Sequence, residues 1–142
     1  MRIRFTPQDQ RAVYEKGDVK IVLFPCDRTD INVSWKRMGV SIPADAWEER
    51  EGRSFLNRSK LTPEVARRVE QDDDFLIASK LESIEGIAIE DDAGTPLDLL
   101  AMSEQDRTDL VTLLRQSMPE FSIWCAQYVR GGEKKSGRMV AD

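Results

Sequence analysis

The sequence of 142 residues contains no histidine, only two cysteines and no long apolar run. The lack of histidine excludes Ser-His and Cys-His nucleophile pairs and histidine ligation of a metal. Cys26 and Cys125 lie far apart, each without a second cysteine nearby, so we expect free core thiols rather than a disulfide framework or a zinc knuckle. No glycine-rich phosphate loop occurs. We therefore predict a protein that is not an enzyme and binds no cofactor or metal.

Apolar stretches are also too short for a membrane protein. None approaches the ~20 residues of a membrane-spanning helix, and residues 1–5 lack the apolar core of a secretory signal. The net charge of −5 argues against general binding to nucleic acid, which depends on neutralising phosphates. We expect a soluble, intracellular protein whose partners are neither membranes nor nucleic acid.

The charge is distributed unevenly along the chain. Residues 1–60 carry 12 basic and 9 acidic side chains, residues 61–129 carry 5 and 15, and residues 130–142 carry 4 and 2. The corresponding net charges are +3, −10 and +2. The acidic middle segment could steer a basic partner, an effect that should weaken with salt.

The first 36 residues have the pattern of β structure. Apolar and polar residues alternate at 3–5 and at Ile31–Trp35, while Val19–Phe24 is apolar at nearly every position. Turn-forming residues at 26–30 predict a hairpin between the latter two strands. Residues 7–17 are polar and are compatible with a short helix or a loop.

The rest of the sequence, after residue 36, is predicted to be mainly helical. The pattern is weak from 39 to 60, with a possible helix at Ala44–Arg50. Thr62 followed by Pro63 and Glu64 is a good helix start, and the helix should continue to about Lys80. A short β segment is expected over 84–89, followed by a turn at 90–94 and a brief return strand at 95–97.

Two further helices are predicted near the C-terminus. Ser103 followed by Asp106 indicates a capped helix over Glu104–Gln116. This helix should bury Leu110, Val111, Leu113 and Leu114. Pro119 opens the second helix, which ends at the Gly131-Gly132 pair.

These elements predict an α+β fold, with an N-terminal β hairpin or small antiparallel sheet followed by a mainly α-helical body. A single domain over 1–130 is expected, β-rich over 1–36 and mainly helical over 62–130. Residues 131–142 are predicted to be a flexible, disordered tail.

The acidic clusters do not predict a catalytic or metal site. Asp72, Asp73 and Asp74 are consecutive on the predicted helix, so they point about 100° apart and should form a solvated acidic face rather than converge on one ion. The acids at 90–94 lack the spacing of a calcium loop and are better explained as a hairpin turn. With 26 acids in the chain, nothing selects one carboxylate pair for catalysis.

The last helix carries an aromatic face formed by Phe121, Trp124 and Tyr128, together with Cys125. Such a face is compatible with the protein core. Large aromatics are also the side chains that anchor binding partners, so the three aromatic residues are candidates for partner binding.

The segment from Ile77 to Tyr128 resembles the tail assembly chaperones of long-tailed bacteriophages. The similarity rests on the order of its parts: an apolar helix end, the step at 84–87, the acidic turn at 91–97, the capped helix from Ser103, and a final helix opened by Pro119.

The resemblance implies a non-catalytic protein of the host cell cytoplasm that binds the tape measure protein and helps recruit tail tube subunits. It also implies a longer form made by translational frameshifting, with residues 131–135 compatible with a slippery codon run, and it leaves self-association open. The composition equally allows a virion structural or adaptor protein of the head–tail junction or baseplate, or an acidic inhibitor that mimics nucleic acid.

Overall fold

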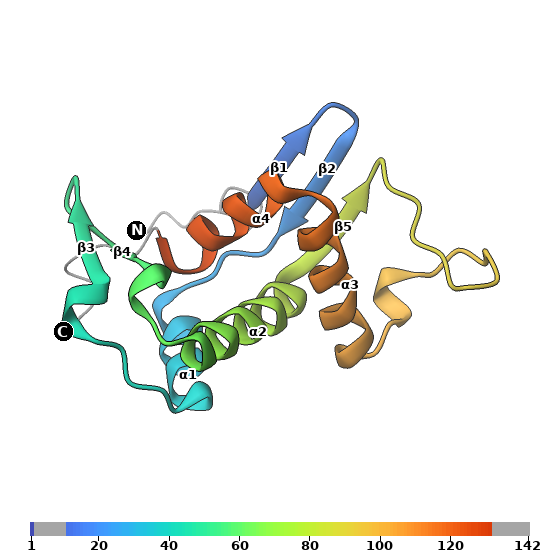
Figure 1. The fold of residues 1–142 in the computed structure, drawn as a ribbon. Coiled ribbons are helices and arrows are strands. Elements are labelled where there is room, and N and C mark those ends of the chain that lie inside the picture. The colour runs from blue at the N-terminus through green and yellow to red at the C-terminus, as the bar shows by residue number, and fades with distance from the viewer. Residues whose placement is uncertain (2–10, 132–142) are drawn as a thin grey trace.

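The computed structural model, which describes residue 1 and residues 11–131, combines a small antiparallel sheet with a helical body (Figure 1). Strands β1 (Ala12–Lys16), β2 (Val19–Leu23) and β5 (Leu81–Glu85) form the sheet in the order β1-β2-β5, and both pairs are antiparallel. The predicted α+β class, with strands near the N-terminus followed by helices, is confirmed.

The N-terminal hairpin uses different strands from those predicted. Val19–Leu23 is a strand, as expected, but it pairs with Ala12–Lys16, which was expected to be helix or loop. Gly17, with φ +60°, forms part of the tight connection between them. The predicted strand at 3–5 lies outside the described residues.

The predicted strand Ile31–Trp35 is wrong, because it lies within helix α1 (Arg28–Met38). The helix starts with a reciprocal capping box between Asp27 and Asp30, and Gly39 ends it in the left-handed conformation. The buried residues of α1 follow helical rather than alternating spacing, and they are Ile31, Ser34 and Met38.

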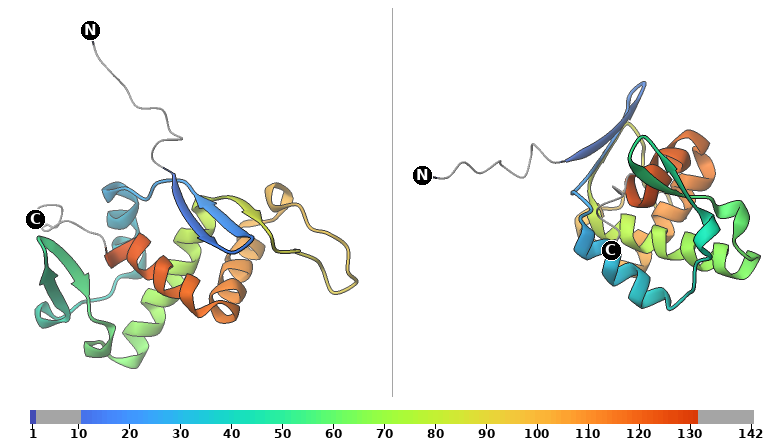
Figure 2. Two further views of the ribbon diagram at one scale, coloured as in Figure 1. Left: turned by 90° about the horizontal axis from the view of Figure 1, so that it is seen from above. Right: turned by 90° about the vertical axis from the view of Figure 1, so that its left-hand side faces the viewer.

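The predicted helix over Ala44–Arg50 is also wrong. Only the single turn η2 (Ala44–Ala46) is helical, and strands β3 (Trp47–Arg50) and β4 (Arg53–Leu56) then form a second hairpin. Glu51 and Gly52 connect the two strands with φ of 54° and 76°, the left-handed values that favour two-residue hairpins. This hairpin and the segment after β5 lie at opposite ends of the molecule (Figures 1 and 2).

Helix α2 (Pro63–Lys80) runs through the middle of the fold, preceded by the short turn η3 (Arg58–Lys60). The Thr62 hydroxyl accepts a hydrogen bond from the Val65 amide, so the predicted helix and its cap are confirmed. The helix buries Val69, Leu76 and Ile77. The main core around Leu76 and Ile77 also includes Ile21, Leu23, Leu81, Val111 and Phe121.

The C-terminal helices agree closely with the predictions. Helix α3 (Glu104–Ser117) is capped by Ser103, and α4 (Pro119–Ala126) continues into the π-helical turn η5 (Gln127–Gly131). A single turn, η4 (Leu99–Ala101), precedes α3. The predicted tail lies, apart from Gly131, outside the described residues. Within residues 11–131, no helix is long and apolar enough to cross a membrane.

Candidate protein-binding groove

The three consecutive aspartates of α2 are buried, so the predicted solvated acidic face is wrong. Asp72, Asp73 and Asp74 are exposed to only 8%, 1% and 8%. Because successive helical residues point in different directions, each carboxylate faces a different neighbouring element. The prediction assumed that charged residues stay on the surface, but buried charges are retained where they are paired.

Each aspartate has an arginine partner from a different part of the chain. Asp72 binds Arg37 of α1 at 2.6 Å and accepts a hydrogen bond from the Ser34 hydroxyl. The other two pairs are Asp73 with Arg58 of η3 and Asp74 with Arg115 of α3, both at 2.5 Å. These pairs fix α1, η3 and α3 around α2, which indicates a structural role.

The predicted aromatic face belongs largely to the core. Phe121 has no exposed surface, whereas Trp124 and Tyr128 are half-buried. Phe121 and Trp124 stack with ring centroids 5.9 Å apart, as do Trp124 and Tyr128 at 5.6 Å. The Tyr128 hydroxyl donates a hydrogen bond to the carbonyl of Phe24. Phe121 is therefore inaccessible to a partner in this conformation, while Trp124 and Tyr128 present only part of their surface.

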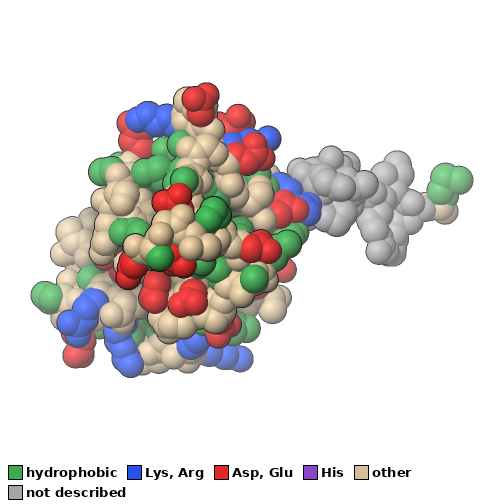
Figure 3. Space-filling view, turned by 90° about the vertical axis from the view of Figure 1, so that its right-hand side faces the viewer, with side chains coloured by type: hydrophobic (Ala, Val, Ile, Leu, Met, Phe, Trp, Pro, Cys, Tyr) green, Lys and Arg blue, Asp and Glu red, His purple; other side chains and the backbone are tan. Residues whose placement is uncertain are grey.

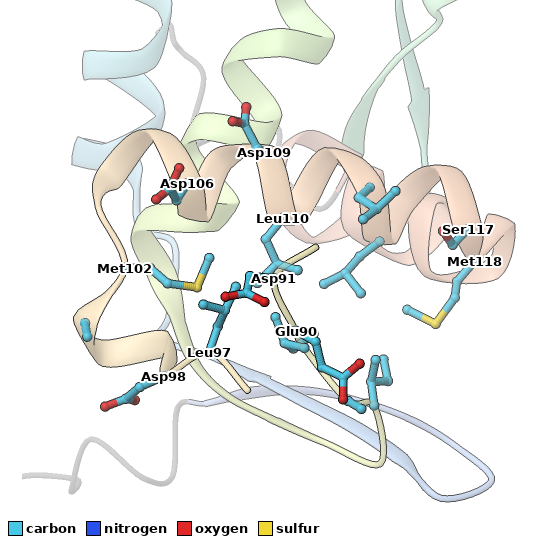
Figure 4. Close-up of a pocket in the computed structure, with 16 residues that line it drawn as sticks. Glu90, Asp91, Leu97, Asp98, Met102, Asp106, Asp109, Leu110, Ser117 and Met118 are labelled. Carbon is cyan, nitrogen blue, oxygen red and sulfur yellow. The ribbon is translucent and has the colours of Figure 1, made fainter. Parts of the chain in front are cut away.

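An open apolar groove lies between α3 and the segment that precedes it (Figure 4). We call residues 87–98 the arm, and the cavity of about 740 Å³ between the arm and α3 the α3 groove. Met102 and Met118 lie at opposite ends of the groove (Figure 4). Its other apolar lining residues are Ile87, Ala88, Ile89, Leu97, Ala101, Leu110, Leu113 and Leu114.

The arm is placed by a close backbone contact at its base. Gly86 has φ +83°, and a Cβ atom at this position would lie 2.1 Å from the carbonyl oxygen of Asp18 in the β1–β2 connection. Only glycine permits both the left-handed backbone and this approach. The chain consequently leaves β5 at Gly86 and extends away from the helical body (Figure 1).

Hydrogen bonds within the arm shape its tip. Asp91 Oδ1 accepts from the amides of Ala93 and Thr95, both at 2.9 Å, and the Asp91 amide donates to the Thr95 carbonyl. The Leu97 amide donates to the Ile89 carbonyl, and Glu90 and Pro96 form an isolated antiparallel bridge. The predicted turn at 90–94 is confirmed. The expected return strand over 95–97 amounts only to the isolated bridge at Pro96, and the expected β segment over 84–89 is shifted, because β5 spans Leu81–Glu85.

Arg107 connects the end of the arm to the body. Its guanidinium donates to the carbonyls of Ala78 and Leu81, at the junction of α2 and β5, and to the carbonyl of Leu99 in η4. These carbonyls come from both sides of the arm in the sequence. Arg107 therefore joins α3, the junction of α2 and β5, and the turn that follows the arm in one hydrogen-bond network.

Carboxylates line the groove, and no lysine or arginine of the described residues does so. The acidic side chains are those of Glu90, Asp91, Asp98, Asp106 and Asp109, all from exposed residues. Across the part of the chain that the structure describes, none of these five carboxylates forms an ion pair. On the face of the molecule that bears the arm, acidic side chains gather among apolar ones, while basic side chains lie toward the margins (Figure 3).

Sequence reasoning identified the turn, the cap and the helix but not the groove they form. Leu113 was expected to be buried, yet it is 59% exposed and lines the groove, whereas Leu110, Val111 and Leu114 are buried as predicted. The missed signal was local charge: residues 85–109 contain eight acids and a single basic residue, Arg107. Residues 11–131 show no cluster of three or more side chains arranged to hold a metal.

Comparisons with protein-family models, with curated proteins and with solved structures find no match to this chain.

Proposed function

We propose that this protein is a non-catalytic assembly chaperone of a long-tailed bacteriophage, which binds the tape measure protein in the host cytoplasm and helps bring tail tube subunits to it. The observation that carries the proposal is the α3 groove, an exposed apolar surface preformed between two ordered walls. The resemblance of residues 77–128 to tail assembly chaperones covers every element that builds this groove.

The groove has the properties of a site for another protein chain. Leu113 is 59% exposed and Leu97 41% exposed, so apolar surface remains available for burial. The methionines at its two ends are flexible side chains that adapt to partners of different shape. A chaperone that covers apolar segments of a long helical protein requires such a surface.

Co-expression with the tape measure protein tests this function. We expect the native chain to increase the soluble fraction of the tape measure protein and to elute with it as a complex. Leu113→Asp should abolish both effects, because it places a charge among the apolar residues that line the groove. Ile123→Asp is the matched control, since Ile123 is a similarly exposed apolar residue on α4 outside the groove. The proposal is wrong if the native chain neither solubilises nor binds the tape measure protein.

Mass spectrometry of purified virions separates this function from that of a structural or adaptor protein. An assembly chaperone should be missing from the finished particle, whereas an adaptor should be present in stoichiometric amounts. The nucleic-acid mimic has less support, because Asp72, Asp73 and Asp74 are paired with arginines inside the fold. Strongly salt-dependent binding of this protein to a nucleic-acid enzyme would support the hypothesis of a nucleic-acid mimic.

A further inference from the structure

We infer that the α3 groove binds a short amphipathic helix that carries lysine or arginine on both flanks of its apolar face. This inference rests on the proposed function only in taking the groove as the surface that contacts the partner. It adds the chemistry of the bound segment, which neither the resemblance nor the apolar character of the groove supplies.

The acidic residues on the two walls of the groove determine which side chains are favoured on the flanks of the bound segment. Asp106 and Asp109 belong to α3, with the Asp109 carboxylate at the outer edge of this wall and pointing away from the arm, while Glu90 and Asp91 lie on the opposite wall formed by the arm (Figure 4). No basic side chain of the described residues lines the groove to offset them. A segment placed in the groove has carboxylates along the edges of both walls, so basic residues on both flanks are favoured and acidic residues there are repelled.

The form of the groove favours a helix. The α3 residues that line it, from Asp106 through Leu110 and Leu113 to Ser117, follow a single helical stripe. The 14 residues of α3 extend about 20 Å at 1.5 Å per residue, which matches three to four turns of a partner helix. A helix satisfies its own backbone hydrogen bonds and therefore needs only side-chain contacts, whereas an extended segment needs a strand edge, and the α3 wall provides none.

A pair of synthetic peptides tests the inference directly. Both have leucine at helical spacing on one face, but one carries lysine on both flanks and the other carries glutamate at the same positions. We expect the full chain to bind the lysine peptide, to increase its helical circular dichroism, and to ignore the glutamate peptide. Affinity should fall as the Debye length shortens from about 10 Å at 0.1 M salt to about 3 Å at 1 M.

Charge-reversal variants locate the binding. Glu90→Lys combined with Asp109→Lys changes one residue on each wall, and we expect it to weaken binding of the lysine peptide about tenfold, from several exposed charge interactions of modest strength. Glu15→Lys combined with Glu70→Lys makes the same change in net charge at exposed sites outside the groove, so it is the matched control. Its affinity should stay within about twofold of the native value, as expected for distant screened charges.

The outcomes separate this inference from the proposed function. Equal affinity for the two peptides, no binding of either peptide, or equal effects of the two double variants would overturn the basic-helix assignment. Soluble complexes with the tape measure protein under those same results would leave the chaperone proposal intact. Conversely, selective peptide binding without any tape measure complex would support the groove chemistry and reject the chaperone proposal.

Discussion

Replacing Gly86 by alanine should destabilise the fold strongly, because this glycine sits where β5 passes the β1–β2 connection. Its φ is +83°, and an added Cβ would lie 2.1 Å from the Asp18 carbonyl oxygen and 2.7 Å from the carbonyl carbon. Both neighbours are backbone atoms, so no side-chain rotation relieves the contact. Gly94, in the tip of the arm, has the same φ, but a Cβ atom there would meet nothing within 4 Å.

Because Gly86 and Gly94 have the same φ, the cost of the left-handed backbone can be separated from the cost of overpacking. The left-handed backbone costs about 1–2 kcal/mol for a residue with a Cβ atom, and it applies to both variants. Overpacking adds about 1–3 kcal/mol at Gly86 alone. The smaller unfolded-state entropy of alanine affects both variants alike and cancels in the comparison. Gly86→Ala should therefore lose about 2–5 kcal/mol, and Gly94→Ala about 1–2 kcal/mol.

Thermal unfolding followed by far-ultraviolet circular dichroism measures this difference. At an unfolding entropy of about 2.1 cal/mol/K per residue, 1 kcal/mol corresponds to roughly 3 °C for a chain of this length. We expect the Tm of Gly86→Ala to lie about 3–10 °C below that of Gly94→Ala. Equal Tm values for the two variants would refute the argument that a backbone contact at Asp18 fixes the base of the arm.

Three further predictions concern the buried polar groups. Asp74→Ala should lower the free energy of unfolding, measured by urea titration, by about 3–5 kcal/mol, because it leaves Arg115 without its ion-pair partner. The control Glu70→Ala, on the exposed side of α2, should change the free energy of unfolding by less than about 0.5 kcal/mol. Ser54→Ala should leave the free energy of unfolding unchanged or raise it by up to about 1 kcal/mol, because the buried Ser54 hydroxyl has no hydrogen-bond partner among the described residues. A decrease in the free energy of unfolding of more than about 1 kcal/mol would contradict this prediction. Burial raises the pKa of the Cys125 thiol to about 12, so a thiol reagent at neutral pH should label Cys125 only after unfolding.

Local signals in the sequence predicted the elements that start with a side-chain cap. Thr62 and Ser103 accept hydrogen bonds from backbone amides three residues later, and both helices begin where those caps place them. The same reasoning applied to Asp27 and Asp30 would have found α1. The strand prediction rested on alternation over Ile31–Trp35 alone, and five residues are too few to distinguish a strand from one face of a helix.

Features that depend on distant parts of the chain were not predictable from local pattern. The arginine partners of Asp72, Asp73 and Asp74 lie 35, 15 and 41 residues away in sequence, so nothing near the aspartates indicated that they would be buried. The groove likewise requires the arm to stand apart from α3. At the base of the arm, Gly86 passes close to Asp18 in the β1–β2 connection, and these two residues are far apart in sequence.

The buried aspartates change how the net charge of −10 over residues 61–129 bears on binding. Three of its fifteen acids are neutralised inside the fold, two of them by Arg37 and Arg58 from the basic first segment. Those pairs hold the fold together and contribute little field at the surface. The five carboxylates of the α3 groove have no such partners in the described structure. The groove therefore retains a negative field that can attract a basic partner. Reversing groove charges should slow association, while Asp74→Ala should affect stability without changing the salt dependence of binding.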